Sequence, residues 1–152
     1  MSIETVRKDF QRRNIELEIL EFNVSSATVE LASQALGVEP GRIAKTMAFK
    51  IKDEDVLIVA KGDVKVDNRK FKDAFGAKAK MLSSEELLES TGHPVGGVCP
   101  FGLKNPLKVF LDESLRAYDF VYPAVGAPNS AVKVELKYLE NITNGEWVDV
   151  CK

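Results

Sequence analysis

Hydrophobic residues recur at helical spacing in several segments of the chain. Ile3, Val6 and Phe10 fall on one face of a helix predicted over residues 3–13, with the charged residues elsewhere. Three further helices are predicted where a Ser or Asp cap precedes the segment and a glycine follows it: one capped by Ser25 or Ser26 and ended by Gly37, one over 68–75 between Asp67 and Gly76, and one between Ser83 and Gly92. A short helix is expected over residues 136–143.

Runs rich in Val, Ile and Phe predict the strands. The clearest is a hairpin over residues 45–63, with a turn at residues 53–55 and Lys45 at the entrance to its first strand. Other strands are predicted over residues 15–22, 80–83, 106–112, 120–126, 131–136 and 146–151. Because short turns join several neighbouring strands while helices are interspersed, the pattern favours a mixed, partly barrel-like β-sheet flanked by helices. The predicted fold class is α+β, in a single domain spanning residues 1–152.

The composition of the chain limits the kinds of partner that it can bind. With 152 residues, 45% of them hydrophobic, the chain can bury one sizeable core. Its formal net charge of -2 provides no global basic field, so any RNA contact must be local. The most basic segment holds Lys61, Lys65, Arg69, Lys70, Lys72, Lys78 and Lys80. This basic segment could equally be a surface that steers an RNA acceptor stem or the solvated face of a helix.

The sequence offers no membrane or metal signal. Its first residues form no apolar signal region, and no apolar run approaches the roughly 20 residues of a membrane helix. A soluble, cytoplasmic protein is therefore expected. Two cysteines and one histidine form no metal-ligand pattern, so we expect neither a metal nor a cofactor.

The segment "GHPVGGVCPFG", residues 92–102, concentrates four glycines, two prolines and the only histidine. Glycines allow positive φ and a close approach to backbone amides, and amides held in place can stabilise the developing charge of acyl transfer. The same composition also suits a tight connection between a helix and a strand. Composition alone does not separate these two interpretations.

Three segments together resemble the family of YbaK-like and prolyl-tRNA synthetase-associated editing domains. These are "TVELASQALGVEPGRIAKTMAFKI", "VLIVAKGDVKVDNRKF" and "GGVCPFG", in this order, and the resemblance runs from about residue 18 to residue 140. Its most specific parts are Lys45 in "RIAKT" and a GxxxP signature that falls on Gly96 and Pro100.

The resemblance implies hydrolysis of the ester between a wrong amino acid and the 3′ end of a tRNA. Lys45 and Gly96 would be catalytic, with Lys45 as the cation that contacts the ester or the terminal phosphate. The substrate would be held by Thr46, by the backbone of Gly97, Val98 and Cys99, and by Pro100, Phe101, Gly126, Asn129 and Ser130. A water molecule or the terminal ribose hydroxyl would be the nucleophile.

The family also implies partners. The aminoacyl-tRNA 3′ end is the expected partner, prolyl-tRNA synthetase is a candidate, and neither DNA nor a membrane is expected. A tRNA for proline carrying a small wrong amino acid is the leading substrate. Residues 122–136 depart from the cysteine-editing and alanine-editing relatives, which leaves the amino acid open.

Other functions stay open on the sequence. The fold could serve as a non-catalytic module that binds tRNA or a synthetase. Cys99 could act as a thiol nucleophile, although free cysteines more often behave as small hydrophobic residues and Cys99 is expected to line the pocket. His93 is expected to be packed or hydrogen-bonded locally. Phe101 or Tyr122 could stack on the terminal adenosine, with core packing the expected role of Phe101.

Overall fold

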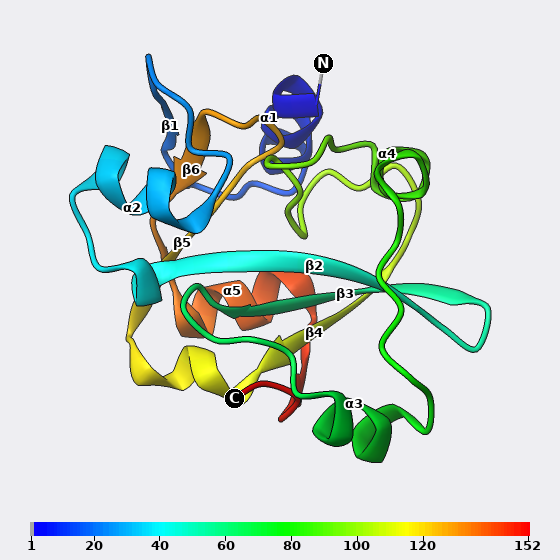
Figure 1. Ribbon diagram of the computed structural model, residues 1–152. Helices are drawn as coiled ribbons and strands as arrows, with labels where there is room; N and C mark the ends of the chain where they lie inside the picture. Colours follow the sequence, from blue (N-terminus) through cyan, green and yellow to red (C-terminus); the bar gives the residue numbers. More distant parts are fainter. Residues whose placement is uncertain (1) are drawn as a thin grey trace.

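A six-stranded mixed sheet forms the centre of the molecule (Figure 1), which is a computed structural model that describes residues 2–152. The strand order is β7-β5-β2-β3-β4-β8. The strands are β2 (Ile43–Ile51), β3 (Glu54–Lys61), β4 (Lys108–Asp112), β5 (Phe120–Pro123), β7 (Val134–Glu135) and β8 (Glu146–Val148). The β2–β3 and β5–β7 pairs are antiparallel, and the pairs β2–β5, β3–β4 and β4–β8 are parallel. A separate antiparallel pair joins β1 (Ile19–Glu21) to β6 (Ser130–Val132).

Helices lie on both sides of the β2–β3 hairpin. They are α1 (Ser2–Arg12), α2 (Val29–Leu36), α3 (Asn68–Phe75), α4 (Ser84–Thr91) and α5 (Leu136–Thr143), with 3-10 turns at Pro40–Arg42 and Glu113–Ala117. In Figure 1, α1, α2 and α4 lie above the hairpin, and α3 and the C-terminus lie below it. The mixed α+β fold with a partly closed sheet confirms the predicted fold class.

Side chains of β3 alternate between two hydrophobic clusters, as the two faces of a pleated strand require. Leu57 and Val59 enter the larger cluster, which holds Val6 and Phe10 of α1 and Leu87 of α4. Val56 and Ile58 enter the smaller cluster, which α3 covers with Phe71. The hairpin is therefore buried on both faces and forms a rigid base for the segments above it.

Local signals predicted most boundaries correctly. Asp67 caps α3, Ser83 and Glu86 form a capping box on α4, and Gly37, Gly76 and Gly92 end their helices in the left-handed conformation. The cap of α2, however, is Thr28, whose Oγ1 accepts a hydrogen bond from the Leu31 amide at 3.1 Å. The prediction of Ser25 or Ser26 was wrong because those residues are held against Pro128, outside the helix.

Three strand predictions also differ from the structure. The strand predicted over residues 131–136 is divided into β6, which pairs with β1, and β7, which pairs with β5 in the six-stranded sheet. The hairpin turn lies at Lys52 and Asp53, both with positive φ, rather than over residues 53–55. The segment 80–83 makes only one bridge, between Met81 and Phe49, because it leaves the edge of β2 to begin α4. Among residues 2–152, no helix has the length and apolar character to cross a membrane.

Candidate functional site

A cavity of about 270 Å³ opens between α2, β2, the start of α4 and the loop over residues 94–98. The edge of β2 forms part of its wall. Ala44 pairs with β5, and pairing on this side resumes only where the Ala48 carbonyl accepts from the Leu82 amide at 3.1 Å. Thr46 therefore lies in a gap in the sheet edge. This gap opens the wall of the cavity at the middle of β2.

Glycines shape the loop beside the cavity. Gly96 has φ +88°, and a Cβ at this position would lie 2.9 Å from Cβ of Ala27. At Gly97, a Cβ would lie 2.6 Å from the backbone nitrogen of Ala127. Only glycine fits either position, because a side chain would collide with these neighbours. The loop is thus pressed between the entry to α2 and the turn over residues 125–130.

Some backbone amides of this loop make no hydrogen bond within residues 2–152 and are therefore available to a ligand. Gly97 donates to the Pro94 carbonyl at 3.0 Å, and its own carbonyl accepts from the Gly126 amide at 2.8 Å, so the backbone of Gly97 is used within the fold. The amides of Gly96 and Val98 make no hydrogen bond within the described residues 2–152, and both residues line the cavity. Unpaired amides beside a cavity are suitable donors for an oxyanion.

A second chain segment fixes the opposite side of the loop. Asn129 donates from Nδ2 to the Phe22 carbonyl at 3.0 Å, and its own carbonyl accepts from the Phe22 amide at 2.8 Å. Ser26 donates its amide to the Pro128 carbonyl at 2.6 Å. Ser130 Oγ accepts from the amides of residues 125 and 127 and donates to the Ala127 carbonyl. These bonds bring residues 26–28 to the cavity, beside Gly96.

Lys45 lines the same cavity from β2. Its ammonium donates to the carbonyl oxygen of Val64, which lies outside the lining. Burial lowers the pKa of Lys45 below its ordinary value, while the nearby Cys151 and Asp63 act in the opposite direction. Cys151 belongs to the smaller hydrophobic cluster and Val64 packs against it, so the ammonium is directed toward that cluster in this structure. An ammonium has three N–H donors and the bond to Val64 uses one, so two donors remain for a ligand that reaches it.

Two hydroxyls in the cavity wall lack partners. The side-chain oxygens of Ser26 and Thr46 are buried and make no hydrogen bond within residues 2–152. Both residues line the cavity. Among the described residues, the lining contains no aspartate, glutamate, histidine or cysteine, and Lys45 is its one charged residue. Apart from Lys45, the wall is therefore apolar with isolated neutral polar groups.

His93 and Cys99 lie beneath the loop and outside the lining. The buried His93 ring bonds through Nε2 to the Phe101 carbonyl at 2.6 Å and through Nδ1 to the Ser2 hydroxyl. Because the carbonyl can only accept, Nε2 carries the proton and Nδ1 accepts from Ser2. His93 is hydrogen-bonded locally, as predicted. Burial raises the pKa of Cys99 to about 12, which disfavours the thiolate that a nucleophile needs.

The His93 contacts predict a pH-dependent stability. Burial lowers the pKa of His93 in the folded protein, whereas an unfolded histidine titrates near pH 6.5. Below that pH the unfolded chain takes up a proton that the folded chain resists, so the free energy of unfolding falls with falling pH, by up to about 2 kcal/mol at pH 5. Urea unfolding between pH 5 and 8 measures this slope. In His93→Gln, the pH dependence of the free energy of unfolding should flatten between pH 5 and 7. An unchanged slope would contradict a lowered pKa of His93 in the folded protein.

The structure brings together only part of the predicted site. Lys45, Thr46, Gly96, Val98 and Ser130 line one cavity. The remaining predicted residues lie outside the lining and build or support it: Gly97, Cys99, Pro100, Phe101, Gly126 and Asn129. Sequence reasoning missed other lining residues, above all Ser26 and Ala27, and Met81 with Leu82. No local signal marks them, because they reach the cavity through contacts with distant segments.

Cys99 and Phe101 face the core rather than the cavity. Cys99 and Phe101 are fully buried, and the Phe101 ring packs edge-on against Phe10 with centroids 5.3 Å apart. Cys99 belongs to the larger hydrophobic cluster, whereas Val98 lines the cavity. Tyr122 of β5, by contrast, lines the cavity.

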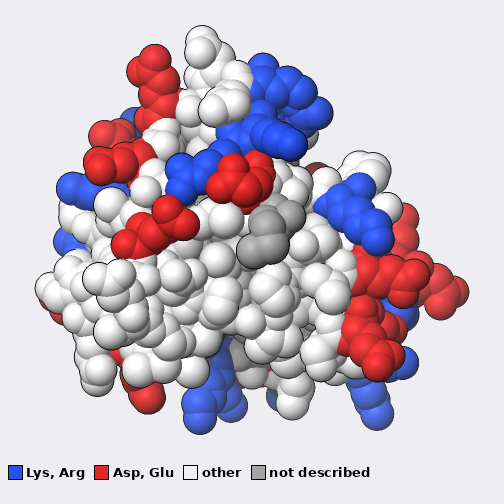
Figure 2. All heavy atoms as spheres, turned by 90° about the horizontal axis from the view of Figure 1, so that it is seen from above, with Lys and Arg blue, Asp and Glu red and all other residues white. Residues whose placement is uncertain are grey.

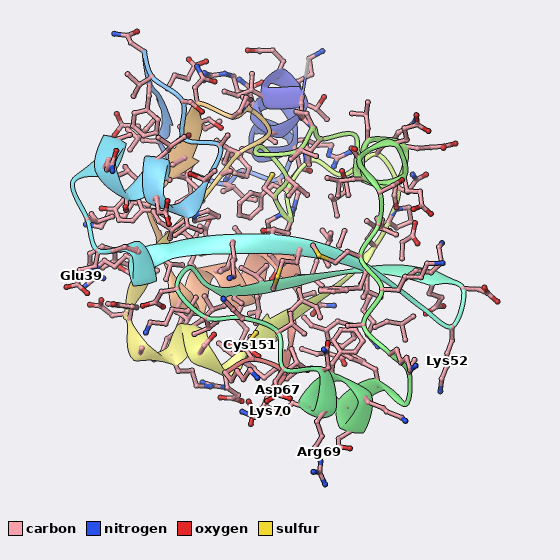
Figure 3. All side chains as sticks on the ribbon, in the orientation of Figure 1. Glu39, Lys52, Asp67, Arg69, Lys70 and Cys151 are labelled. Carbon is pink, nitrogen blue, oxygen red and sulfur yellow. The ribbon has the colours of Figure 1, made fainter. Side chains whose placement is uncertain are left out.

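The surface around the cavity mouth is apolar. All the exposed large hydrophobic residues among residues 2–152 lie on segments that border it: Val24, Leu31, Met81, Leu88 and Val95. Figure 2, which views the molecule from the side of α1, α2 and α4, shows a broad uncharged area with acidic and basic side chains around it. The basic helix α3 lies on the other side of the β2–β3 hairpin, where Figure 3 shows Arg69 directed away from the body. Most of the basic segment is therefore remote from the mouth.

Comparisons with known proteins agree with this architecture. The chain is 48% identical over 154 residues to "Uncharacterized protein YwhH" of Bacillus subtilis, covering 100% of this chain and 98% of that protein. It is 28% identical over 125 residues to the "Putative Cys-tRNA(Pro)/Cys-tRNA(Cys) deacylase EbsC" of Enterococcus faecalis, covering 81% of this chain and 76% of the other. A crystal structure described as "a putative trans-editing enzyme for prolyl tRNA synthetase" superimposes with a TM-score of 0.92 at 30% identity, covering 99% of this chain and 97% of the other.

The family model for the aminoacyl-tRNA editing domain matches residues 24–142. This range begins before the entry to α2 and ends in α5, so it contains every residue that lines the cavity. The chain therefore belongs to the aminoacyl-tRNA editing domain family.

Proposed function

We propose that this protein is a free-standing aminoacyl-tRNA deacylase, which hydrolyses the ester between a wrong amino acid and its tRNA. The observation that carries the proposal is the pair of unbonded amides at Gly96 and Val98, two residues that line the same cavity as Lys45. Family membership places the chain among domains concerned with aminoacyl-tRNA.

The mechanism follows from what the cavity contains. The ester carbonyl lies against the amides of Gly96 and Val98, which stabilise the negative oxygen of the tetrahedral intermediate. Because the described lining holds no carboxylate, histidine or thiol to act as a base, the nucleophile that releases the amino acid is a water molecule. A ribose hydroxyl that attacks first only moves the acyl group to a neighbouring oxygen, and water must still cleave that ester. When water attacks, its oxygen bonds to the carbonyl carbon, the bond to the ribose oxygen breaks, and the ribose oxygen takes a proton. Lys45 supplies positive charge beside the ester or the terminal phosphate.

The substrate's RNA end meets the apolar mouth of the cavity. Unpaired terminal bases expose flat faces that pack on apolar and aromatic side chains. Val95 and Met81, both about 60% exposed, and Tyr122 in the lining offer such contacts. We propose tRNA for proline as the carrier, since the structural relative described above is linked by its description to prolyl-tRNA synthetase. That synthetase is a candidate partner. Because the proposed substrate is charged tRNA, we place the activity in the cytoplasm.

Residues 1–152 together are proposed to form one editing domain. Although the family model begins at residue 24, α1 contributes Val6 and Phe10 to the larger hydrophobic cluster beneath the loop. The hydroxyl of Ser2 also bonds to His93. The N-terminal helix is thus part of what holds the loop in place.

The test is release of labelled amino acid from tRNA for proline charged with alanine, cysteine, serine, threonine or proline. We expect release from a subset of the wrongly charged tRNAs well above the spontaneous rate, and slow release from the proline ester. The second candidate is a module that binds tRNA or a synthetase without hydrolysis. Retention of charged tRNA by folded protein, with no release from any ester, would establish that candidate instead.

A further inference from the structure

Ser26 and Thr46 line the cavity with buried, unpaired hydroxyls. The resemblance implied a substrate contact for Thr46, and none for Ser26. Ser26 is 6% exposed and Thr46 is 9% exposed, and neither side-chain oxygen has a hydrogen-bond partner among residues 2–152. Most buried hydroxyls in proteins are paired, because leaving one unpaired is unfavourable. The only other unpaired buried side-chain atom in the described part of the chain is Nε1 of Trp147, which lies away from this cavity.

Neither hydroxyl has a role in holding the fold. Thr28, not Ser26, caps α2, and Ser26 is anchored through its backbone amide to Pro128. Thr46 lies between Ala44 and Ala48 on β2, in the gap of the sheet edge. Alanine or valine would suit these positions as well or better, since neither would bury an unpaired oxygen.

The surroundings of the two hydroxyls are apolar. Ala32, Ala44, Leu87 and Ala131 are among the residues that complete the wall. Ser26 immediately precedes Ala27, whose Cβ packs against Gly96. The two hydroxyls are therefore the buried, unpaired side-chain hydroxyls of this wall, beside the exposed Ser84 and the partly exposed Tyr122. Their oxygens are almost inaccessible as placed. A rotation about one side-chain bond redirects either oxygen.

We propose that Ser26 and Thr46 form a subsite that binds the polar end of a small hydroxyl- or thiol-bearing side chain on the esterified amino acid. This inference rests on the proposed function. A purely aliphatic side chain leaves both hydroxyls unpaired, whereas a hydroxyl or thiol pairs with them. A site built to hydrogen-bond a substrate hydroxyl rejects the isosteric analogue that lacks it. The subsite thus selects by polarity among amino acids of similar size.

The experiment compares two adenosine analogues that carry threonine or valine through a 3′-amide, which resists hydrolysis. Threonine and valine have nearly the same shape, so the affinity ratio reports the hydroxyl. We expect the wild-type protein to bind the threonyl analogue about 10-fold to 100-fold more tightly. In Thr46→Val and in Ser26→Ala, the ratio should fall toward one. Equal affinities in the wild type, or equal weakening of both analogues by the two substitutions, would overturn the proposal.

Thermal unfolding provides a readout independent of binding. Removing an unpaired buried hydroxyl should raise the Tm of Thr46→Val by about 2 to 4 °C. Ser33→Ala is the matched control, because Ser33 is a buried serine of α2 outside the lining whose hydroxyl donates to the Glu30 carbonyl at 2.8 Å. It should lower Tm and leave the affinity ratio unchanged. A fall of Tm in Thr46→Val would show a structural role and contradict the subsite.

The outcomes separate this proposal from the proposed function. Preference for the threonyl analogue without hydrolysis of any ester would refute the deacylase and retain the subsite. Hydrolysis of the alanine ester as fast as the serine ester, together with equal binding of the two analogues, would retain the deacylase and refute the subsite.

Discussion

Gly96→Ala is expected to lower the rate of ester hydrolysis by about 100-fold or more. One well-placed oxyanion donor contributes on this scale. The added methyl group would lie 2.9 Å from Cβ of Ala27 and 3.3 Å from Cβ of Pro128, and φ of +88° disfavours any residue with a side chain. The loop must therefore shift, and the amides of Gly96 and Val98 shift with it. Single-turnover release of amino acid from the best tRNA measures the loss.

Gly37→Ala is the matched control for this change. Gly37 has φ +70° at the end of α2, so alanine meets similar backbone strain there, but no atom lies within 4 Å of the added Cβ. Gly37→Ala should lose about 1 kcal/mol of unfolding free energy. Gly96→Ala should lose more, because its added methyl group also collides with Ala27. Only Gly96→Ala should lose activity. Equal rates in the two variants would show that the geometry of the loop does not determine catalysis.

Lys45→Met is expected to reduce hydrolysis by about 100-fold, because it removes the one charged group in the described cavity lining while retaining an unbranched side chain. Lys50→Met is the control on the same strand. Lys50 lies outside this lining and pairs with Asp55 at 2.7 Å, so its loss should leave the rate within about twofold. A full rate in Lys45→Met would exclude its charge from the mechanism.

The pH dependence of the rate gives an independent check on Lys45. Since burial lowers its pKa, the ammonium loses its proton at a lower pH than an ordinary lysine does. The enzymatic part of the rate, after subtraction of spontaneous hydrolysis, should fall as pH rises through that pKa. Lys45→Met should show no such fall. An enzymatic rate that rises steadily with pH would contradict a requirement for the cation.

The fold could be predicted largely because its signals are local. The capping box at Ser83 and Glu86, the cap at Asp67 and the glycines that end three helices each depend on residues within one turn. The hairpin was predictable from its hydrophobic runs. Segment 80–83 was mistaken for a full strand because its pairing is limited by where the chain turns away from β2, which is a tertiary property.

The site could be predicted only where a motif marks it. Lys45 and Gly96 belong to such a motif, and both line the cavity. Ser26 carries no motif, because its place in the wall depends on a backbone bond to Pro128, about a hundred residues along the chain. Cys99 and Phe101 lie next to the motif in the sequence, yet both side chains are buried in the larger hydrophobic cluster.

Backbone amide resonances, followed on titration with a 3′-amide aminoacyl-adenosine analogue, report directly on the proposed oxyanion donors. We expect the largest shifts at Gly96 and Val98, whose amides are unbonded within the described residues, with Thr46 also affected. The amide of Gly97, which already bonds to Pro94, should change less. Saturable shifts confined to another surface, such as the charged cavity bordered by Lys50, Glu86 and Lys108, would show that the ester is not held at this loop.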